Sequence, residues 1–451
     1  MKIALYVHCF FPEHYHGTEN FTLAVAKNLQ GMGHEAVVVT TVPEGEQGTF
    51  ESVHRYEFQG IAVYRIDKNH VPASSVGDLY YQPAMEAIHR ELLLEIRPDI
   101  VHVTHLANHT AVLLEVAQEL KMPVVATFTD FFGFCLNGKL EAANGALCSG
   151  PNPQRTNCFS CYVKAGIQHA SPKLDSHQLN RIAPLTHLSG NIFNRIYDLP
   201  LLSGGRLSGQ FRDIKRRVSV LTALFAHYRA AIAPTDFLLS AYRNNGFEGL
   251  PFHKINFGVD LDRKPKPVCS PSAPIRFGFI GQIAPHKGTA DLVEAFCRLP
   301  KGSCELHIFG SEQQSQDYSA KIRVRCADFP VSFRGTFPGE QMRQVLDELD
   351  FLVIPSTWYE NSPLVLLNAL ASHTPVIVSD VAGMTEFLDQ GKNGYAFARG
   401  SVDDLERVMR NILENPESSR ALSQSTQYLK TPANMTEEIV NIYEAIIGNS
   451  G

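Results

Sequence analysis

Short apolar runs alternate with helix-like stretches along the first half of the chain. Helical periodicity covers residues 19–32, which Gly33 ends, and residues 110–120. The apolar runs have the length of buried strands, and they lie at residues 3–7, 35–40, 61–65, 100–103, 124–127 and 230–234. Strand–helix alternation of this kind predicts a parallel, doubly wound α/β sheet.

The second half repeats the pattern after a proline-rich break. Residues 261–274 have no apolar period, so we interpret them as an interdomain linker. Further strands are predicted at residues 275–280, 306–309, 331–334, 351–354, 376–379 and 395–397, with helices at 403–413 and 436–447. The chain therefore predicts two unequal Rossmann-like domains, residues 1–260 and 275–433.

Residues 131–229 interrupt the first domain as an insertion rich in Cys, Asn, Ser and Gly, which closes with a helix. Four of the chain's nine cysteines gather there, namely Cys135, Cys148, Cys158 and Cys161. In a reducing compartment such a cluster favours a metal over disulfides, and four thiolates can close a tetrahedral zinc site. The sequence leaves open a structural zinc, free or redox-active thiols, and an iron–sulfur cluster.

Composition narrows the class of protein. The 451 residues carry a net charge of −6, which argues against a nucleic-acid partner. No apolar run approaches the ~18–20 residues of a membrane span, and the start of the chain is a predicted strand, not a signal peptide. We expect a cytoplasmic protein. The basic and apolar segment 206–229 is either a core helix or a peripheral contact with the inner face of the membrane.

The loop between the predicted strands 351–354 and 376–379 carries one carboxylate, Glu360, just before a short apolar helix. Open α/β sheets bind ligands at the carboxyl ends of their strands, and a helix N-terminus suits a phosphate. A second motif follows the first strand of this half, where the glycine-rich turn 281–288 contains Lys287. Taken singly, each motif also fits an ordinary surface loop.

Together these motifs resemble glycosyltransferase family 4. Its signature has Pro-Ser, a Glu, seven residues, a second Glu, and then a Pro-Val-Ile strand. Glu360 matches the first Glu, and Asn368 takes the place of the second. The family's Gly-Arg followed by Lys-Gly is matched by Lys287, but Gln282 stands where Arg is usual.

The resemblance implies a GT-B fold, with two Rossmann-like domains facing across a cleft and a C-terminal helix, about 434–449, packed back on the first domain. It implies a retaining transferase without a catalytic metal, moving a sugar from a nucleotide-diphosphate sugar to a glycan or lipid-linked acceptor. The residues expected to bind the donor are Gly17, Gly281, Gln282, Lys287, Gly310, Arg334, Glu360, Asn361, Ser362 and Asn368.

The residues expected at the reacting centre are Lys287, Glu360, Asp130 and His105. Lys287 would neutralise the leaving diphosphate and Glu360 would orient the sugar hydroxyls. Asp130 and His105 follow strands of the first domain, where Thr129 replaces a His that many relatives carry. His105 belongs to a group with His102 and His109, which predicts acceptor contacts, hydrogen-bonded strand-end histidines or a metal site.

Two other functions stay open at this point. A nucleotide-sugar-binding partner subunit without activity would explain the departures at Gln282, Thr129 and Asn368. Another GT-B enzyme, such as a nucleotide-sugar epimerase, would share the fold.

Overall fold

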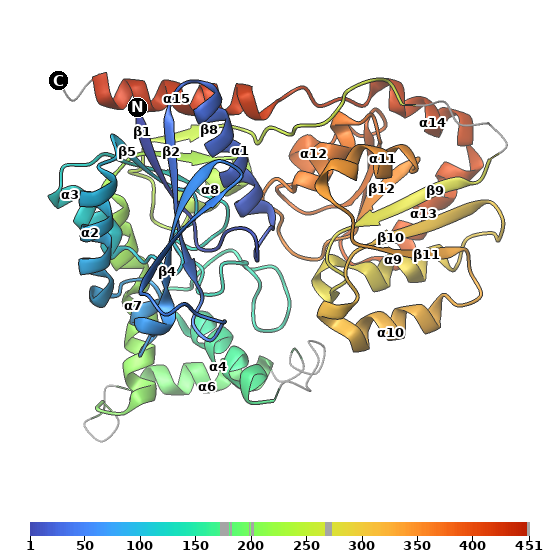
Figure 1. The fold of residues 1–451 in the computed structure, drawn as a ribbon. Helices are drawn as coiled ribbons and strands as arrows, with labels where there is room; N and C mark the ends of the chain where they lie inside the picture. The colour runs from blue at the N-terminus through green and yellow to red at the C-terminus, as the bar shows by residue number, and fades with distance from the viewer. Residues whose placement is uncertain (172–179, 181–182, 198, 200–202, 267–272, 449–451) are drawn as a thin grey trace. The chain divides into compact units, whose positions relative to one another are not determined.

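The computed structural model describes residues 1–171, 180, 183–197, 199, 203–266 and 273–448. The chain divides into two compact units, which are drawn in Figure 1. The first comprises Met1–Asn256 and Pro432–Gly451, and the second comprises Phe257–Thr431. The chain thus leaves the first unit once, builds the second, and returns to the first with its last helix.

The described strands of the first unit form one eight-stranded sheet in the order β3-β4-β2-β1-β5-β6-β7-β8. Neighbouring strands are parallel except β3 and β4, which form an antiparallel edge. The strands are β1 (Lys2–Tyr6), β2 (Glu35–Val42), β3 (Val53–Phe58), β4 (Ile61–Asp67), β5 (Ile100–Val103), β6 (Val124–Thr127), β7 (Tyr228–Ala233) and β8 (Phe252–Lys254). The central strands are mostly apolar and almost entirely buried, as expected when helices cover both faces.

The helices of the first unit fall into two groups. Those around the sheet are α1 (Gly17–Gly31), α2 (Glu86–Ile96), α3 (Val112–Glu119), α8 (Asp236–Arg243) and α15 (Pro432–Gly448). Those within the predicted insertion are α4 (Thr156–Ala170), α6 (Ala183–Ile196) and α7 (Arg206–Phe225). The sequence predicted only the closing helix of this insertion, so α4 and α6 were not predicted. A small core around Phe159 and Phe211 holds the three helices together.

Helix α15 packs against one end of α1 and buries Met435, Ile439 and Tyr443 in the first unit (Figure 1). The hydroxyl of Tyr443 is hydrogen-bonded to the ring of His102 in β5. The helix begins at Pro432, because proline suits a first helical turn, where no N–H is needed. The C-terminal helix is therefore part of the core of the first unit.

The described strands of the second unit form a six-stranded parallel sheet in the order β11-β10-β9-β12-β13-β14. They are β9 (Ile275–Ile280), β10 (Cys304–Phe309), β11 (Val331–Gly335), β12 (Phe351–Ile354), β13 (Val376–Ser379) and β14 (Gly394–Phe397). The helices are α9 (Thr289–Phe296), α10 (Gln316–Arg325), α11 (Met342–Asp347), α12 (Leu364–Ala371), α13 (Val402–Glu414) and α14 (Pro416–Ser425).

The order of this sheet identifies its topological switch point. From β9 the chain winds through β10 and β11 toward one edge, whereas β12, β13 and β14 lie on the other side of β9. The winding reverses between β9 and β12, and open α/β sheets bind ligands beyond the carboxyl ends of strands at such a point. The loops that follow β9 and β12 are those that carry Lys287 and Glu360.

Candidate functional site

Lys287 and Glu360 meet at the switch point of the second sheet. The Lys287 Nζ lies 2.6 Å from Oε1 of Glu360. The same oxygen accepts hydrogen bonds from the hydroxyl of Ser356, at 2.7 Å, and from the indole N–H of Trp358, at 2.9 Å. Among the described residues none donates to the other oxygen, Oε2. The carboxylate is thus held firmly at one oxygen and has the second left for a ligand.

The charge of Glu360 is stabilised by its surroundings. Its burial, with 9% of the residue exposed, raises the pKa of the carboxyl. The charge of Lys287 and the hydrogen bonds from Lys287, Ser356 and Trp358 outweigh this effect, so the pKa lies below its ordinary value. Glu360 is therefore ionised at neutral pH in spite of its burial.

Two glycines let the loops of this site approach each other. At Gly288, φ is +69° and a Cβ would lie 1.9 Å from the carbonyl oxygen of Pro355. At Gly310, a Cβ would lie 2.1 Å from the carbonyl oxygen of Gly281. The loops after β9, β10 and β12 are thereby packed backbone to backbone, which brings Gly281, Gly310, Lys287 and Glu360 into one neighbourhood.

Aromatic contacts add to the rigidity of the site. The rings of His286 and Trp358 have centroids 4.0 Å apart, and the Lys287 Nζ lies 5.0 Å from the centroid of the indole. A cation at this distance from an aromatic face is attracted to it. The backbone N–H of Thr357 also donates to the carbonyl of His286 at 2.8 Å. The Lys287 and Glu360 loops are therefore one connected structure.

The other predicted donor-binding residues surround this centre less closely. Gln282 is exposed, and Arg334 is an exposed side chain 3.3 Å from Oε2 of Glu348. Asn361 and Asn368 are half-buried, the latter on α12. The hydroxyl of Ser362 is buried and has no hydrogen-bond partner among the described residues.

In the first unit, His105 and Asp130 form a second polar pair. His105 Nε2 lies 3.1 Å from Oδ2 of Asp130, and its Nδ1 accepts from the N–H of Ala107 at 3.2 Å, so the proton on Nε2 faces the carboxylate. Burial lowers the pKa of His105, but the charge of Asp130, its hydrogen bond to the ring and the charge of Glu19 together outweigh burial, so the pKa is raised overall. The pair follows β5 and β6, as the sequence predicts.

A buried carboxylate that the sequence analysis did not single out lies beside this pair. Glu19 is 2% exposed and its Oε1 lies 3.4 Å from Nε2 of His8, whose ring is 4.1 Å from that of His105. Its Oε2 has no hydrogen-bond partner among the described residues. The sequence signal for this carboxylate is its place in the first turn of α1, two residues after Gly17. A Cβ on Gly17 would have no atom within 4 Å.

The remaining histidines of the predicted group have structural partners. The His102 ring contacts the hydroxyls of Tyr443 and Thr127, and His109 Nε2 bonds to the carbonyl of Val7 at 2.9 Å. Burial lowers the pKa of each to about 3. Within the described ranges, no group of three or more His, Cys, Asp or Glu side chains is arranged to hold a metal ion as it stands. Of the alternatives for His102 and His109, these contacts support structural histidines that are held by hydrogen bonds.

A polar hollow of about 330 Å³ lies at the carboxyl ends of β1 and β2 in the first unit. An ion pair of Glu13 with Arg65 at 2.8 Å and a hydrogen bond between His14 and Glu46 at 3.0 Å border it. Sequence reasoning missed this hollow, although charged residues directly after the first strand were a signal. Its size and its mixed charges suit a small polyhydroxylated group.

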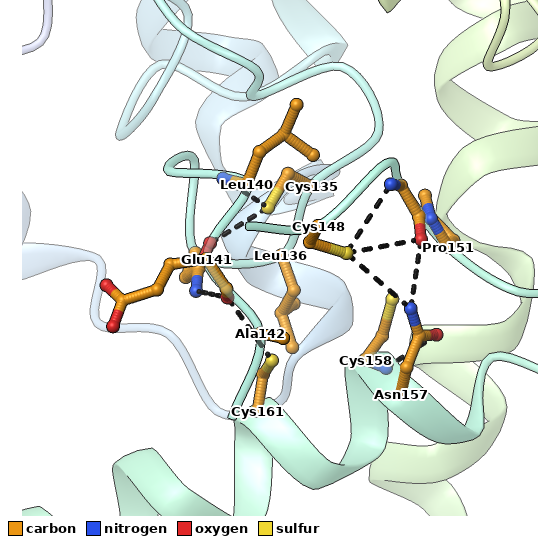
Figure 2. A pocket seen from close by; sticks show the side chains of 12 residues that line it. Cys135, Leu136, Leu140, Glu141, Ala142, Cys148, Pro151, Asn157, Cys158 and Cys161 are labelled. Atoms are coloured by element: carbon orange, nitrogen blue, oxygen red, sulfur yellow. Dashed lines mark hydrogen bonds between the residues drawn. The ribbon is translucent and has the colours of Figure 1, made fainter. Parts of the chain in front are cut away.

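The four clustered cysteines line one small cavity, shown in Figure 2. Cys158 and Cys161 lie on α4, and Cys135 and Cys148 lie on the loop that precedes it. The predicted basic segment that follows is α7, which buries Phe211, Ile214 and Arg217 in the first unit. In the parts of the chain that the structure describes, no helix is long and apolar enough to span a membrane.

Two parallel-sheet α/β units, with paired loops at the switch point of the second, define a GT-B fold. Family models match both halves of the chain, "Glycosyl transferase 4-like domain" over residues 16–158 and "Glycosyl transferases group 1" over residues 262–428. The chain belongs to these glycosyltransferase families, which confirms the resemblance to family 4.

Relatives and solved structures agree with this placement. Glycogen synthase of Mycobacterium tuberculosis is 29% identical over 172 residues, which cover 37% of this chain and 41% of that protein. The amylovoran biosynthesis glycosyltransferase AmsK of Erwinia amylovora is 26% identical over 245 residues, covering 50% and 59%. The chain therefore matches about two to three fifths of the length of these relatives.

Among solved structures, HepE of Anabaena in complex with UDP-glucose has a TM-score of 0.62 at 15% identity, with 99% of this chain and 100% of that chain covered. Sucrose-phosphate synthase of Thermosynechococcus elongatus has a TM-score of 0.61 at 15% identity, with 99% of both chains covered. At this level of identity the likeness shows the fold.

Proposed function

We propose that this protein is a retaining glycosyltransferase that moves a sugar from a nucleotide-diphosphate sugar to a glycan or lipid-linked acceptor. The observation that carries the proposal is the Lys287–Glu360 pair, placed at the switch point of the second sheet with one carboxylate oxygen left for a ligand. The glycosyltransferase relatives and the UDP-glucose complex of HepE support it.

In this proposal the second unit binds the donor. Lys287 supplies the cation for the leaving diphosphate, and Oε2 of Glu360 accepts hydrogen bonds from the sugar hydroxyls. Such contacts strengthen as positive charge grows on the sugar and negative charge grows on the phosphate, so they lower the barrier to transfer. Asn368 contacts the ribose, and the turn at Gly281 and Gly310 admits the diphosphate.

The remaining donor residues have lesser roles in this proposal. Gly17 offers an open backbone position to the diphosphate, and Arg334 borders the base. Gln282, in the loop after β9, and Asn361 and Ser362, in the loop after β12, provide further polar contacts to the donor. No catalytic metal is required, because Lys287 and backbone N–H groups take the charge of the diphosphate.

The first unit binds the acceptor. The hollow bordered by Glu13, His14, Glu46 and Arg65 takes a sugar ring of the acceptor, because carboxylates and a guanidinium bind hydroxyl groups in defined directions. Asp130 and His105 act on the reacting hydroxyl, His105 as the group that holds the orientation of Asp130. Replacing Arg65 with Met should raise KM for the acceptor and leave donor affinity unchanged.

The test of the donor site uses nucleotides and a single carboxylate change. Thermal shift with UDP, GDP, ADP and CMP identifies the base, since a ligand at 100 times its Kd adds ~2.7 kcal/mol of stability. Glu360→Gln should then lower single-turnover transfer ~10²–10³-fold with a smaller effect on nucleotide affinity. The matched control is Glu340→Gln, an exposed residue of the short 3-10 helix Gly339–Gln341 in the same unit. Normal transfer by Glu360→Gln would refute the assignment, and NMR of the product anomer tests retention.

We also propose a peripheral membrane contact through α6. Leu185, Leu188 and Ile192 are 67%, 58% and 53% exposed at helical spacing, and Arg195 and Arg206 are exposed nearby in the sequence. An apolar row beside basic side chains suits an anionic lipid surface. Sedimentation with phosphatidylglycerol and phosphatidylcholine vesicles tests it. Leu188→Ser/Ile192→Ser should abolish binding to the former, and equal binding of wild type to both would contradict the idea.

A further inference from the structure

We propose that Cys135, Cys148, Cys158 and Cys161 form a structural zinc site in the first unit. The four thiols come from different places along the chain and line a single cavity of about 20 Å³ (Figure 2). That volume is about what one water molecule or one ion needs. The other described cysteines lie elsewhere in the molecule. The proposal is independent of the proposed transferase activity.

The backbone around the cavity presents the thiols from two sides. Cys158 and Cys161 are three residues apart on α4, so they share one face near the start of the helix. Cys135 is buried and Cys148 half-buried on the preceding loop, which folds over that face. Two ligands from a helix turn and two from a loop are a common arrangement of four-cysteine zinc sites.

Weak local hydrogen bonds hold the thiols at present. Cys135 donates to Oδ1 of Asn137 at 2.8 Å, Cys148 to the carbonyl of Gly150 at 3.4 Å, and Cys161 to that of Glu141 at 3.7 Å. Zinc at a Zn–S distance of about 2.3 Å would require side-chain rotations that exchange these bonds for metal ligation. Binding releases one proton from each of the four thiols, and the ion with four thiolates carries a net charge of −2.

Cationic groups around the cavity suit that negative charge. Arg217 is 4% exposed, its Nη1 has no hydrogen-bond partner among the described residues, and it lies near enough to Asp130, and to Cys135 and Cys158 as thiolates, for their charges to stabilise it. Arg155 acts in the same way on Cys158, and Lys164 on Cys161. The N-terminus of the 15-residue helix α4 adds its positive dipole end. A buried guanidinium with an unsatisfied donor is stabilised by anionic neighbours, and a tetrathiolate zinc site would add a second one to Asp130.

The site would fix a segment that also touches the candidate reacting centre. The loop from Cys135 to Cys148 folds back on Asp130: the N–H of Phe131 donates to the carbonyl of Gly138, and a Cβ on Gly138 would lie 2.8 Å from Oδ2 of Asp130. Zinc would cross-link this loop to α4 and so hold it in place beside Asp130.

The experiment measures metal in the full-length protein, purified under reducing conditions. Elemental analysis should give close to one zinc per chain, and X-ray absorption should show four sulfur ligands at about 2.3 Å. Replacement by Co²⁺ should give thiolate-to-cobalt charge-transfer absorption. Cys158→Ser/Cys161→Ser should lose the metal, whereas Cys297→Ser/Cys326→Ser, which removes two cysteines outside the cavity, should keep it.

The absorption and cobalt measurements need no variant, so they decide the question even if the serine variant fails to fold. A reduced chain that binds neither Zn²⁺ nor Co²⁺, with four thiols that alkylate in the folded state, would overturn the proposal. So would mass spectrometry that finds the four sulfurs in two disulfides, or a spectrum typical of an iron–sulfur cluster in the protein as purified.

Discussion

Removing Lys287 tests the centre of the candidate site most directly. Lys287 forms a partly buried ion pair: its side chain is 22% exposed, and that of its partner Glu360 is 11% exposed. Hydrogen bonds to charged groups contribute about 1.5–3 kcal/mol, so Lys287→Met should destabilise the second unit by about that amount. Because Glu360 would keep only its neutral donors Ser356 and Trp358, its pKa should rise.

A double-mutant cycle isolates the interaction itself. Lys287→Met and Glu360→Gln together should cost less than the sum of the two single changes, with a coupling energy of at least ~1 kcal/mol. The matched control is Lys392→Met, which removes a surface pair with Asp389 whose side chains are 69% and 58% exposed, and should leave the stability almost unchanged.

The assay exploits an internal probe. Trp358 is the only tryptophan of the chain and donates to Glu360, so its fluorescence in urea reports the unfolding of the second unit. Transfer by Lys287→Met should fall ~10²–10³-fold if the lysine faces the leaving phosphate. A coupling energy near zero would refute the buried ion pair. Normal transfer in a variant that shows the coupling would leave Lys287 a purely structural role.

Three further outcomes follow from single contacts. Gly310→Ala should destabilise the second unit by ~1–3 kcal/mol in the same urea assay, because a backbone carbonyl oxygen occupies the place of the new methyl group. In the control Gly339→Ala the methyl group meets no atom within 4 Å, so the stability should hardly change. Asp130→Asn should lower the raised pKa of His105, which NMR of the ring can follow. The stability that the pair contributes is present below the unfolded pKa of ~6.5 and is lost as the pH rises through the folded pKa. The free energies of unfolding of wild type and variant should therefore converge at high pH. Tyr443→Phe should cost ~1–3 kcal/mol by leaving Nδ1 of the buried His102 without its partner, while Nε2 keeps Thr127, and should speed proteolysis of α15.

Much of the fold follows from local patterns, because parallel strands covered on both faces are continuous apolar runs. For this reason the predicted bounds agree to within one residue for β1, β5, β6 and β9, and to within two residues for β2 and β10. The edge strand β3 was not, since its sequence Val-His-Arg-Tyr-Glu-Phe is largely polar and its residues are at most half-buried. Helices α4 and α6 were missed as well, because their apolar residues pack on one another and on α7 within the insertion, away from the main sheet.

The partners of individual side chains were less predictable than the elements. Lys287 and Glu360 were both expected at the site, but their contact joins loops 73 residues apart and depends on β9 and β12 being neighbours. The partner of His102 lies 341 residues further along the chain, so no local pattern distinguishes this histidine from the neighbouring His105. Burial and hydrogen bonding separate the two roles only once the sheet is assembled.

The return of the chain to its first unit has a consequence for synthesis. Residues 1–256 leave the ribosome long before α15 exists, so the surface that Met435, Ile439 and Tyr443 cover stays open while the whole second unit is being made. The N-terminal unit is thus the first to start folding and the last to finish. A fragment that stops before Pro432 would expose that apolar surface permanently and would leave the ring of His102 without the tyrosine that bonds to it.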